Sequence, residues 1–421
     1  MSHESPGRAG LPGGPPGRSS AEAALRSVDG RPSARLGQHL RRLREGYGYT
    51  LRKVEEKAFS LGESIDNSQL SRFEKGKALP SFDKLRALAR IFNVSIQNFS
   101  DVLDLEEFEP FKPETDDYDA LLTIGAQSLS RGEYGRAFVA YEKAVEVAER
   151  NEGPGQNDRL ASARWSMATA LKALGKLSMC EHELREILKL RNETKPGIQI
   201  RALLQLGSVY RELGDLCLAE VLVRESLALA VASTDAPAHA TALNTLANIY
   251  ETSDLTKALA FYERAHEVLA ASGGANDQKL VVLTNLGGCL VKAGRFQEGL
   301  AKLQAVHGSA REYGYRRIAA LSATRIGEAY LQHADVARAS HEFAESDTLA
   351  SDPAGPYHDI LFLNAFHRWV GAKDDGNGTR EKIAFGRLRH LRSLLERRFP
   401  EVDEFDRWVA KHRRFDHEHF A

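Results

Sequence analysis

The sequence repeats itself with a period close to 40 residues across residues 119–351. Turn residues mark the period at spacings of 43, 39, 40, 40 and 40: Gly132, Gly175, Gly214, Asp254, Gly294 and Ala334. A fixed period of this length is typical of chains that stack one helical unit on the next, because a single unit cannot bury its own apolar face. The repeat therefore constrains this part of the chain to an elongated stack.

Each repeat has the order helix, turn, helix, loop, with one small residue at a fixed place in each helix. The small residues of the first helices are Gly125, Ala168, Gly207, Ala247, Gly287 and Gly327, and those of the second helices are Ala137, Cys180, Ala219, Ala258, Gly299 and Ala339. Small side chains let two helices approach closely. The pattern resembles the tetratricopeptide repeat (TPR), which implies a right-handed α-solenoid, although the period exceeds the usual one of about 34. The fourth repeat is one residue shorter, which leaves its turn near Ser253 open.

The region before the repeats predicts five short amphipathic helices within residues 35–100. Apolar residues recur there at helical spacing, as in Leu36, Leu40 and Leu43. Residues of the type that caps helix N-termini precede the later runs: Thr50, Asp66, Ser81 and Ser95. The whole chain is therefore predicted to be all-α, a five-helix domain followed by the solenoid.

The run from Asp66 to Lys77, followed by Pro80-Ser81-Phe82, resembles the Cro/repressor-type (XRE) helix-turn-helix family. The resemblance implies that Arg44 pairs with Glu74. It also implies that four residues face base edges: Asn67, Ser68, Gln69 and Arg72. Four others would approach phosphates: Thr50, Lys53, Lys75 and Lys77. Asn, Gln and Arg are the residue types that bind base edges bidentately. Two departures are Leu51, where the family often has a polar residue, and a turn over residues 59–65 about two residues longer than usual.

Charge is distributed in agreement with this assignment. Residues 35–100 carry 13 basic and 7 acidic side chains, residues 101–119 carry 1 and 9, and residues 120–421 carry 39 of each. A basic module beside an acidic segment indicates that one part of the chain faces a polyanion. A basic bundle that only contacts protein is the alternative.

These features divide the chain into five segments. Residues 1–34, with 6 Gly, 5 Pro and 6 Ser, are predicted to be a disordered tail. A helix-turn-helix domain at 35–103, an acidic linker at 104–118 and six TPR-like repeats at 119–351 follow. Residues 352–421 are predicted to form a degenerate seventh repeat and capping helices, because a stack needs an atypical unit to cover its last apolar face.

The first helix of each TPR pair is expected to line a concave groove that binds extended peptides or partner helices. Alignment of the repeats nominates groove positions on these helices, and eight of them form the candidate set: Trp165, Lys172, Arg201, Arg211, Asn244, Asn248, Asn285 and Lys292. An Asn side chain can pair with both the N–H and the C=O of a peptide backbone. Each residue taken singly is also explained as a polar group within the stack.

The order of these modules resembles the Rap/Rgg/NprR/PlcR/PrgX superfamily of regulators. The resemblance implies a cytoplasmic, homodimeric transcription factor that binds double-stranded DNA and a peptide or protein effector. The alternative is a TPR adaptor that captures a partner protein, with the DNA-binding domain only localising it. No catalytic, phosphate-loop or metal motif is present, so we expect no enzyme activity, cofactor or metal. His412, His417 and His419 are predicted to be solvated.

Two further expectations concern the surroundings of the chain. The longest apolar stretch, near residues 218–232, is interrupted by Arg224 and Glu225, so no membrane association is expected. The three cysteines, Cys180, Cys217 and Cys289, form no close pair. They are predicted to be buried apolar groups in a reducing compartment.

Overall fold

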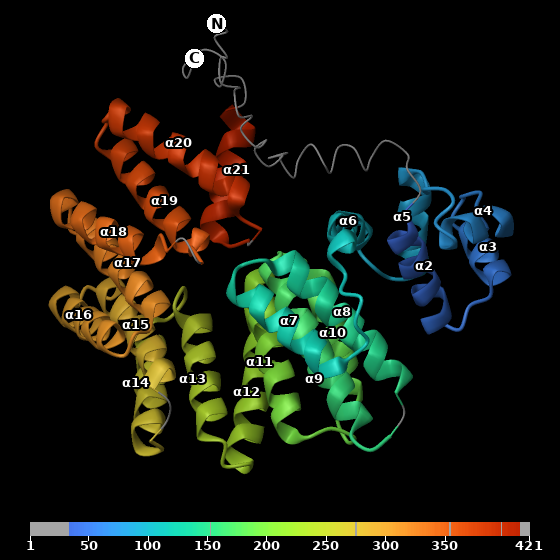
Figure 1. The fold of residues 1–421 in the computed structure, drawn as a ribbon, viewed down its shortest axis with the longest axis horizontal. Helices are drawn as coiled ribbons and strands as arrows, with labels where there is room; N and C mark the ends of the chain where they lie inside the picture. The colour runs from blue at the N-terminus through green and yellow to red at the C-terminus, as the bar shows by residue number, and fades with distance from the viewer. Residues whose placement is uncertain (1–32, 152, 274–275, 353–354, 397, 413–421) are drawn as a thin grey trace, which may run out of the picture. The chain divides into compact units, whose positions relative to one another are not determined.

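The computed structural model describes residues 33–151, 153–273, 276–352, 355–396 and 398–412 (Figure 1). Every regular element among them is a helix, which confirms the all-α class and its order of a five-helix domain followed by repeated helix pairs. The chain forms two compact units, Met1–Glu107 and Phe108–Ala421. Each unit is described by itself.

The first unit contains the five predicted helices. They are α2 (Ala34–Gly46), α3 (Leu51–Ser60), α4 (Asn67–Glu74), α5 (Phe82–Ile91) and α6 (Ile96–Asp104). Thr50, Asp66 and Ser95 each accept a hydrogen bond from a backbone N–H of the first turn, whereas Ser81 occupies the N-cap position without such a bond. Helix α2 begins at Ala34 with Ser33 as its cap, so two residues of the predicted tail are ordered. The rest of that tail, residues 1–32, lies outside the described residues.

The core of this unit gathers apolar side chains from all five helices. Its fully buried members include Leu36, Leu40, Val54, Leu70, Leu88, Phe92 and Phe99. The six-residue turn between α3 and α4 runs from Leu61 to Asp66, and Gly62 in it has φ +80°. Ile65 is buried and anchors the end of this turn to the core.

The acidic segment differs from the predicted linker. Helix α6 continues to Asp104, and a 3₁₀ helix, η1, covers Leu105–Phe111. Phe108 packs directly on α8, because a Cβ at Gly135 would lie 2.1 Å from its ring. Lys112 reaches Glu146 at 2.8 Å. Phe108 and Lys112 therefore dock the part of this segment from residue 108 onward onto the first repeat.

The second unit is a series of helix pairs. The six predicted pairs are α7 (Tyr118–Ser130) with α8 (Tyr134–Arg150), α9 (Gln156–Ala173) with α10 (Leu177–Lys189), α11 (Pro196–Leu213) with α12 (Leu216–Ala232), α13 (Ala236–Tyr250) with α14 (Leu255–Ala271), α15 (Asn276–Lys292) with α16 (Phe296–Glu312), and α17 (Arg316–Gln332) with α18 (Val336–Ala350). A seventh pair, α19 (His358–Asp374) and α20 (Gly378–Leu394), precedes a last helix, α21 (Pro400–His412). Helix α21 packs on the seventh pair through Val402 and Phe405.

Turn chemistry explains the period. Gly132, Gly175, Gly214 and Gly294 lie between paired helices with φ between +74° and +85°, and Ala334 takes the same left-handed conformation. A glycine adopts this conformation without steric cost. The fourth pair differs, because α13 ends at Tyr250 and Asp254 caps α14 by accepting a hydrogen bond from the Lys257 N–H. That turn closes over residues 251–254 without a positive-φ residue.

Close approach of paired helices depends on the small residues identified in the sequence. A Cβ at Gly207 would lie 2.4 Å from Val223, one at Gly327 would lie 2.6 Å from the Phe343 ring, and one at Gly299 would lie 2.6 Å from the backbone oxygen of Gly287. Cys180 and Cys289 are buried, as expected. Cys217 is exposed, which corrects the prediction for that residue, because it lies on the outer face of α12.

Replacing Gly299 tests this packing. We expect Gly299→Ala to lower the free energy of unfolding by about 1 to 3 kcal/mol, because its methyl group meets backbone atoms that cannot rotate away. Gly308→Ala on the same helix is the control, since a Cβ there meets nothing within 4 Å. That variant should be neutral or more stable by up to about 1 kcal/mol. Urea unfolding measures both, and equal effects would contradict the packing argument.

Candidate functional site

Helix α4 presents a polar edge at its N-terminus. The Asp66 side chain accepts a hydrogen bond from the Gln69 backbone N–H at 2.7 Å, while Leu70 and Phe73 bury the opposite face of the helix. Asn67, Ser68 and Arg72, three of the four residues predicted to read bases, are exposed on this helix. The structure therefore places amide, hydroxyl and guanidinium donors on one solvent-facing side of a short, capped helix.

Gln69, the fourth of these residues, is half-buried and held by a residue that sequence reasoning missed. Lys84 on α5 donates from Nζ to Gln69 Oε1 at 2.8 Å, and its ammonium lies 5.9 Å from the centre of the Phe73 ring. Because a lysine can only donate, Gln69 must turn its oxygen toward Lys84 and its amide N–H₂ away. No local pattern in the sequence signals this contact, since the two residues belong to different helices.

The residues predicted to approach phosphates lie at the ends of two helices. Thr50 caps α3 by accepting a hydrogen bond from the Lys53 backbone N–H, and the Lys53 ammonium lies 3.2 Å from Glu56. Lys75 and Lys77 follow directly after α4 and are exposed. The structure thus brings basic side chains to the two ends of the helix-turn-helix unit.

Arg44 and Glu74 form the ion pair that the family resemblance implies. Arg44 Nε donates to Glu74 Oε1 at 2.6 Å and Nη2 donates to Oε2 at 3.0 Å, while Nη1 donates to the Tyr49 carbonyl at 2.9 Å. The two side chains are only 14% and 7% exposed. This bidentate pair fixes the end of α4 against α2, and its hydrogen bond raises the pKa of Arg44.

In the second unit, the first helices of successive pairs lie side by side. Helix α9 contacts α11, α11 contacts α13, α15 contacts α17, and α17 contacts α19. Residues of α11, α13, α15 and α17 together line a polar cavity of about 260 Å³. Four of the eight predicted groove residues line it: Arg211, Asn248, Asn285 and Lys292. Lys172 lines a second cavity, described below, and Trp165, Arg201 and Asn244 line neither of these two.

The eight predicted residues are tied to one another or to their neighbours in the stack. Lys172 contacts Ser208 and Glu212, and Arg211 lies 3.8 Å from Glu212. Asn285 Nδ2 donates to Asn244 Oδ1 at 3.0 Å, and the Lys292 ammonium lies 2.7 Å from Glu251. The Arg201 guanidinium lies 4.8 Å from the Trp165 ring centre, and Tyr262 donates to Asn248. Many of these partners are about one repeat apart in sequence. These residues therefore form several small polar networks within the stack.

Two residues that support or line this cavity were missed. Tyr262 on α14 is buried, and its hydroxyl donates to Asn248 Oδ1 at 2.5 Å. The same repeat position holds Tyr141 in the first pair and Val223, Leu303 and Phe343 in others, so the residue type alone did not distinguish Tyr262. Arg325 lines the cavity one repeat after Asn285, so the repeat register could have identified it.

A charged triad lies at one end of this cavity. Arg325 donates to Glu328 at 2.6 Å, and His367 Nε2 lies 2.8 Å from the other Glu328 oxygen. Burial alone would raise the pKa of Glu328, but the charges and hydrogen bonds of Arg325 and His367 outweigh it and lower the pKa to about 2. Glu328 is therefore ionised throughout the physiological pH range.

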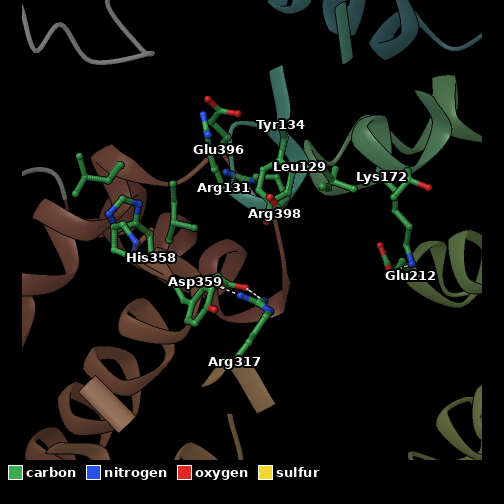
Figure 2. A pocket seen from close by; sticks show the side chains of 18 residues that line it. Leu129, Arg131, Tyr134, Lys172, Glu212, Arg317, His358, Asp359, Glu396 and Arg398 are labelled. Atoms are coloured by element: carbon green, nitrogen blue, oxygen red, sulfur yellow. Dashed lines mark hydrogen bonds and ion pairs between the residues drawn. The ribbon is translucent and has the colours of Figure 1, made fainter. Parts of the chain in front are cut away.

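The second cavity, of about 380 Å³, lies between the first repeats and the last ones (Figure 2). Its lining comes from the α7–α8 turn, the end of α9, Arg317 with Asp359, and the segment after α20. That segment spans the cavity, because Arg398 N–H donates to the Ala173 carbonyl at 3.0 Å and Glu396 accepts from the Gly135 N–H at 2.9 Å. These contacts of Glu396 and Arg398 are called the clasp below.

The clasp is held from the C-terminal side by acidic residues of α21. Arg398 donates to Asp403 at 2.5 Å and to Asp406 at 2.7 Å, and Arg392 donates to Asp406 at 3.0 Å. Burial alone would raise the pKa of Asp406, but the hydrogen bonds from Arg392 and Arg398 lower it overall. Sequence reasoning gave no indication of this long-range contact.

Two remaining expectations concern absences. No helix of the described residues is long and apolar enough to cross a lipid bilayer. His417 and His419 lie outside the described residues, whereas His412 Nδ1 lies 2.8 Å from the Trp408 carbonyl.

Neutralising Glu328 tests the charged triad. Because its pKa is depressed, its stabilising contribution is present above the unfolded-state pKa near 4.5 and is lost as the pH falls through about 2. We expect Glu328→Gln to lower the free energy of unfolding by about 3 kcal/mol at pH 7, and the difference from wild type to shrink below about pH 4. Urea unfolding of wild type and variant at pH 7 and below about pH 4 measures this difference. Glu298→Gln, on an exposed pair with Arg295, should cost less than about 1 kcal/mol.

Comparison with known proteins identifies the two kinds of domain. The family described as helix-turn-helix domain matches residues 37–105, and the family described as tetratricopeptide repeat matches residues 199–271. No curated protein matches the sequence. Both matching families agree with the motifs found in the sequence.

Solved structures of similar fold include two Rap proteins. The Rap protein complexed with Competence and Sporulation Factor is 16% identical, covers 88% of this chain and 98% of its own, and has a TM-score of 0.52. The Rap conjugation gene regulator of the plasmid pLS20, complexed with the Phr* peptide, is 14% identical, covers 90% and 98%, and has a TM-score of 0.51.

Bacillus thuringiensis PlcR in complex with the peptide PapR7 and DNA is 18% identical and covers 80% of this chain and 98% of its own. Its TM-score of 0.34 carries no argument about the fold. The chain thus contains a helix-turn-helix domain followed by tetratricopeptide repeats, and its fold resembles that of the Rap proteins.

Proposed function

We propose that the protein is a sequence-specific DNA-binding transcriptional regulator whose TPR domain binds a peptide effector that modulates DNA binding. The observation that carries the first half is the exposed side of α4, where Asn67 and Ser68 lie beside the Asp66 cap and Arg72 lies in the last turn. In helix-turn-helix proteins the N-terminal residues of the second helix contact base edges in the major groove. Asn suits adenine and Arg suits guanine at such an edge.

Affinity for DNA is supplied by the basic side chains around this edge. Lys53, Lys75 and Lys77 are exposed near the ends of α3 and α4, where they suit phosphate contacts that are sensitive to salt. One helix of eight residues reaches few base pairs. We therefore propose a cytoplasmic homodimer that reads two half-sites about one helical turn apart.

The peptide half of the proposal rests on the polar cavity lined by residues of α11, α13, α15 and α17. Its lining offers amide, guanidinium, ammonium and carboxylate groups along four successive first helices, which suits an extended backbone with polar ends. The Rap protein of plasmid pLS20, whose fold is similar, was solved with a Phr* peptide. A peptide that binds one arrangement of the repeats better than another would shift the DNA-binding equilibrium by that difference in affinity.

Arg72→Ala tests the recognition helix. We expect it to reduce preference for selected fragments of sheared genomic DNA over scrambled sequence by about 5- to 150-fold, corresponding to about 1 to 3 kcal/mol per bidentate contact. Weak, salt-sensitive binding to any duplex should remain. Lys77→Ala should instead weaken binding to all sequences alike and reduce the slope of log affinity against log salt by about 1. Unchanged footprints with Arg72→Ala would remove the assignment.

Asn285→Ala tests the groove. Displayed random heptapeptides are panned on the full chain, and the selected peptide is titrated against the variants. We expect Asn285→Ala to weaken that peptide about 5-fold or more, because each hydrogen bond contributes about 1 kcal/mol. Arg338→Ala, exposed on the second helix α18, should leave affinity unchanged. Failure to enrich any peptide, together with nuclease-resistant recovery of a folded partner, would favour the adaptor alternative.

A further inference from the structure

One position in a row of otherwise polar residues on the first helices carries no side chain. This position directly follows the small residue of each first helix. It is occupied by Thr169, Ser208, Asn248, Gly288 and Glu328 in repeats two to six. Gly288 lines the cavity of about 260 Å³ together with Asn248 and Glu328, which stand one repeat before and after it. The polar row is therefore interrupted inside this cavity.

Packing of the fold does not explain the glycine at this position. The preceding residue, Gly287, is required by packing, because a Cβ there would lie 2.8 Å from Leu303. A Cβ at Gly288 meets no atom of the described residues within 4 Å, and its φ is not in the left-handed region. A glycine within a helix is less stable than an alanine. What Gly288 provides is open space in the cavity.

The charged groups around this space have hydrogen-bond donors to spare. Lys292, one helical turn after Gly288, donates to Glu251 at 2.7 Å, and Arg325 donates from one nitrogen to Glu328 at 2.6 Å. An ammonium has three N–H groups and a guanidinium has five. Each cation is thus held in place by one carboxylate and keeps further N–H groups for a ligand.

The cavity lining is positive overall. Three cations, Arg211, Lys292 and Arg325, face two carboxylates, Glu251 and Glu328. All four carboxylate oxygens already lie within 3.1 Å of a nitrogen or hydroxyl of a neighbouring side chain. The surplus in the cavity is therefore of donors and of positive charge. A carboxylate, which is negative and only accepts hydrogen bonds, is the ligand group that matches this surplus.

We propose that the space over Gly288 is a subsite for a carboxylate of the bound peptide, held by Lys292 and Arg325. The inference rests on the proposed peptide binding and names the chemistry that the cavity selects. The carboxylate comes from an acidic side chain or from the C-terminus of the peptide, and both make the same charge-assisted hydrogen bonds. One anchored carboxylate also fixes the register of an extended peptide, which main-chain contacts alone leave free.

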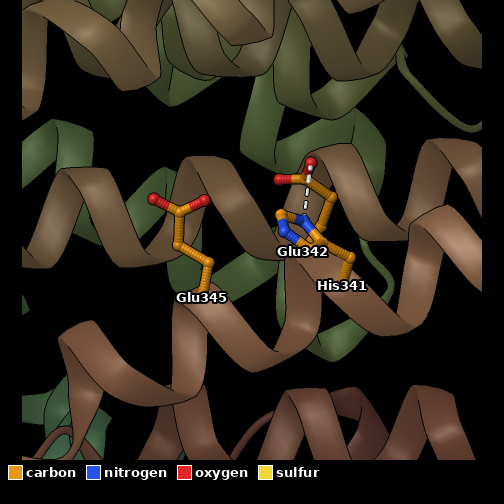
Figure 3. A group of neighbouring side chains, drawn as sticks. All are labelled: His341, Glu342 and Glu345. Carbon is orange, nitrogen blue, oxygen red and sulfur yellow. Dashed lines mark ion pairs between the residues drawn. The ribbon is translucent and has the colours of Figure 1, made fainter.

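A second group of titratable side chains lies on another helix. His341, Glu342 and Glu345 gather on α18, outside the lining of this cavity (Figure 3). Two carboxylates beside one imidazole disfavour an anion, so this group does not compete for a peptide carboxylate. Glu345→Gln is therefore a control for a change of charge away from the subsite.

Two pools of synthetic random heptapeptides test the proposal on the full chain. The first pool contains all residue types and a free C-terminus. In the second, Asn and Gln replace Asp and Glu, and the C-terminus is an amide. Peptides that the chain retains are identified by mass spectrometry, and we expect retention from the first pool alone. A retained peptide is then remade with each carboxylate changed to an amide in turn, and one of these changes should weaken binding about 10-fold or more.

Variants of the chain locate the subsite. Gly288→Leu fills the space and should weaken the retained peptide about 10-fold or more, with a thermal midpoint that is unchanged or higher. Gly308→Leu on α16 is the matched control and should bind as the parent does. Lys292→Gln should reduce the preference for the carboxylate peptide over its amide form about 5-fold or more. Glu345→Gln should leave that preference unchanged.

The possible failures are distinguishable. Equal retention from the two pools, or full affinity in Gly288→Leu, would overturn the subsite while peptide binding itself stands. Retention from neither pool would contradict the peptide half of the proposed function and the subsite together. Circular dichroism of each variant separates loss of the subsite from loss of the fold.

Discussion

The TPR unit depends on helices that approach each other where a side chain is absent. Gly207 faces Val223, Gly327 faces the Phe343 ring, and Gly299 faces the backbone of α15. At each place one helix contributes a bulky side chain or its backbone, and the other contributes a glycine whose missing side chain leaves room for it. Because close-packed interiors tolerate little added volume, this contact sets the angle of each pair and hence the stacking of the next one.

Regular stacking brings equivalent positions of successive first helices together. Asn244 meets Asn285, and Glu251 meets Lys292, each 41 residues further along the chain. The cavity between these helices is consequently lined with polar groups that are partly paired with one another. Under the proposal, a peptide bound there would exchange such bonds for its own, so each exchange would contribute only about 1 kcal/mol and affinity would depend on how many exchanges succeed together. Such a site would discriminate between peptides because a peptide that fails to replace one of these bonds leaves a polar group of the cavity unpaired.

Much of the fold was predictable because it depends on residues that act on near neighbours in sequence or recur at a fixed period. The turn glycines, the small residues and the caps Thr50 and Asp66 act within a few residues or recur at a fixed spacing. Features set by tertiary packing were not predictable. Lys84 meets Gln69 from another helix, and Tyr262 reaches Asn248 from a second helix into the groove. The acidic segment was assigned as a linker from its charge, whereas the docking of Phe108 on Gly135 decides its structure.

The clasp joins the segment after the seventh pair to the first two pairs, through Glu396 with Gly135, which are 261 residues apart in sequence, and Arg398 with Ala173. In an open solenoid each unit contacts only its neighbours, so the pitch of the superhelix changes easily. A contact between the two ends of the solenoid opposes that stretching. A displacement at one end of the solenoid is then transmitted to the other end through the clasp as well as along the stack.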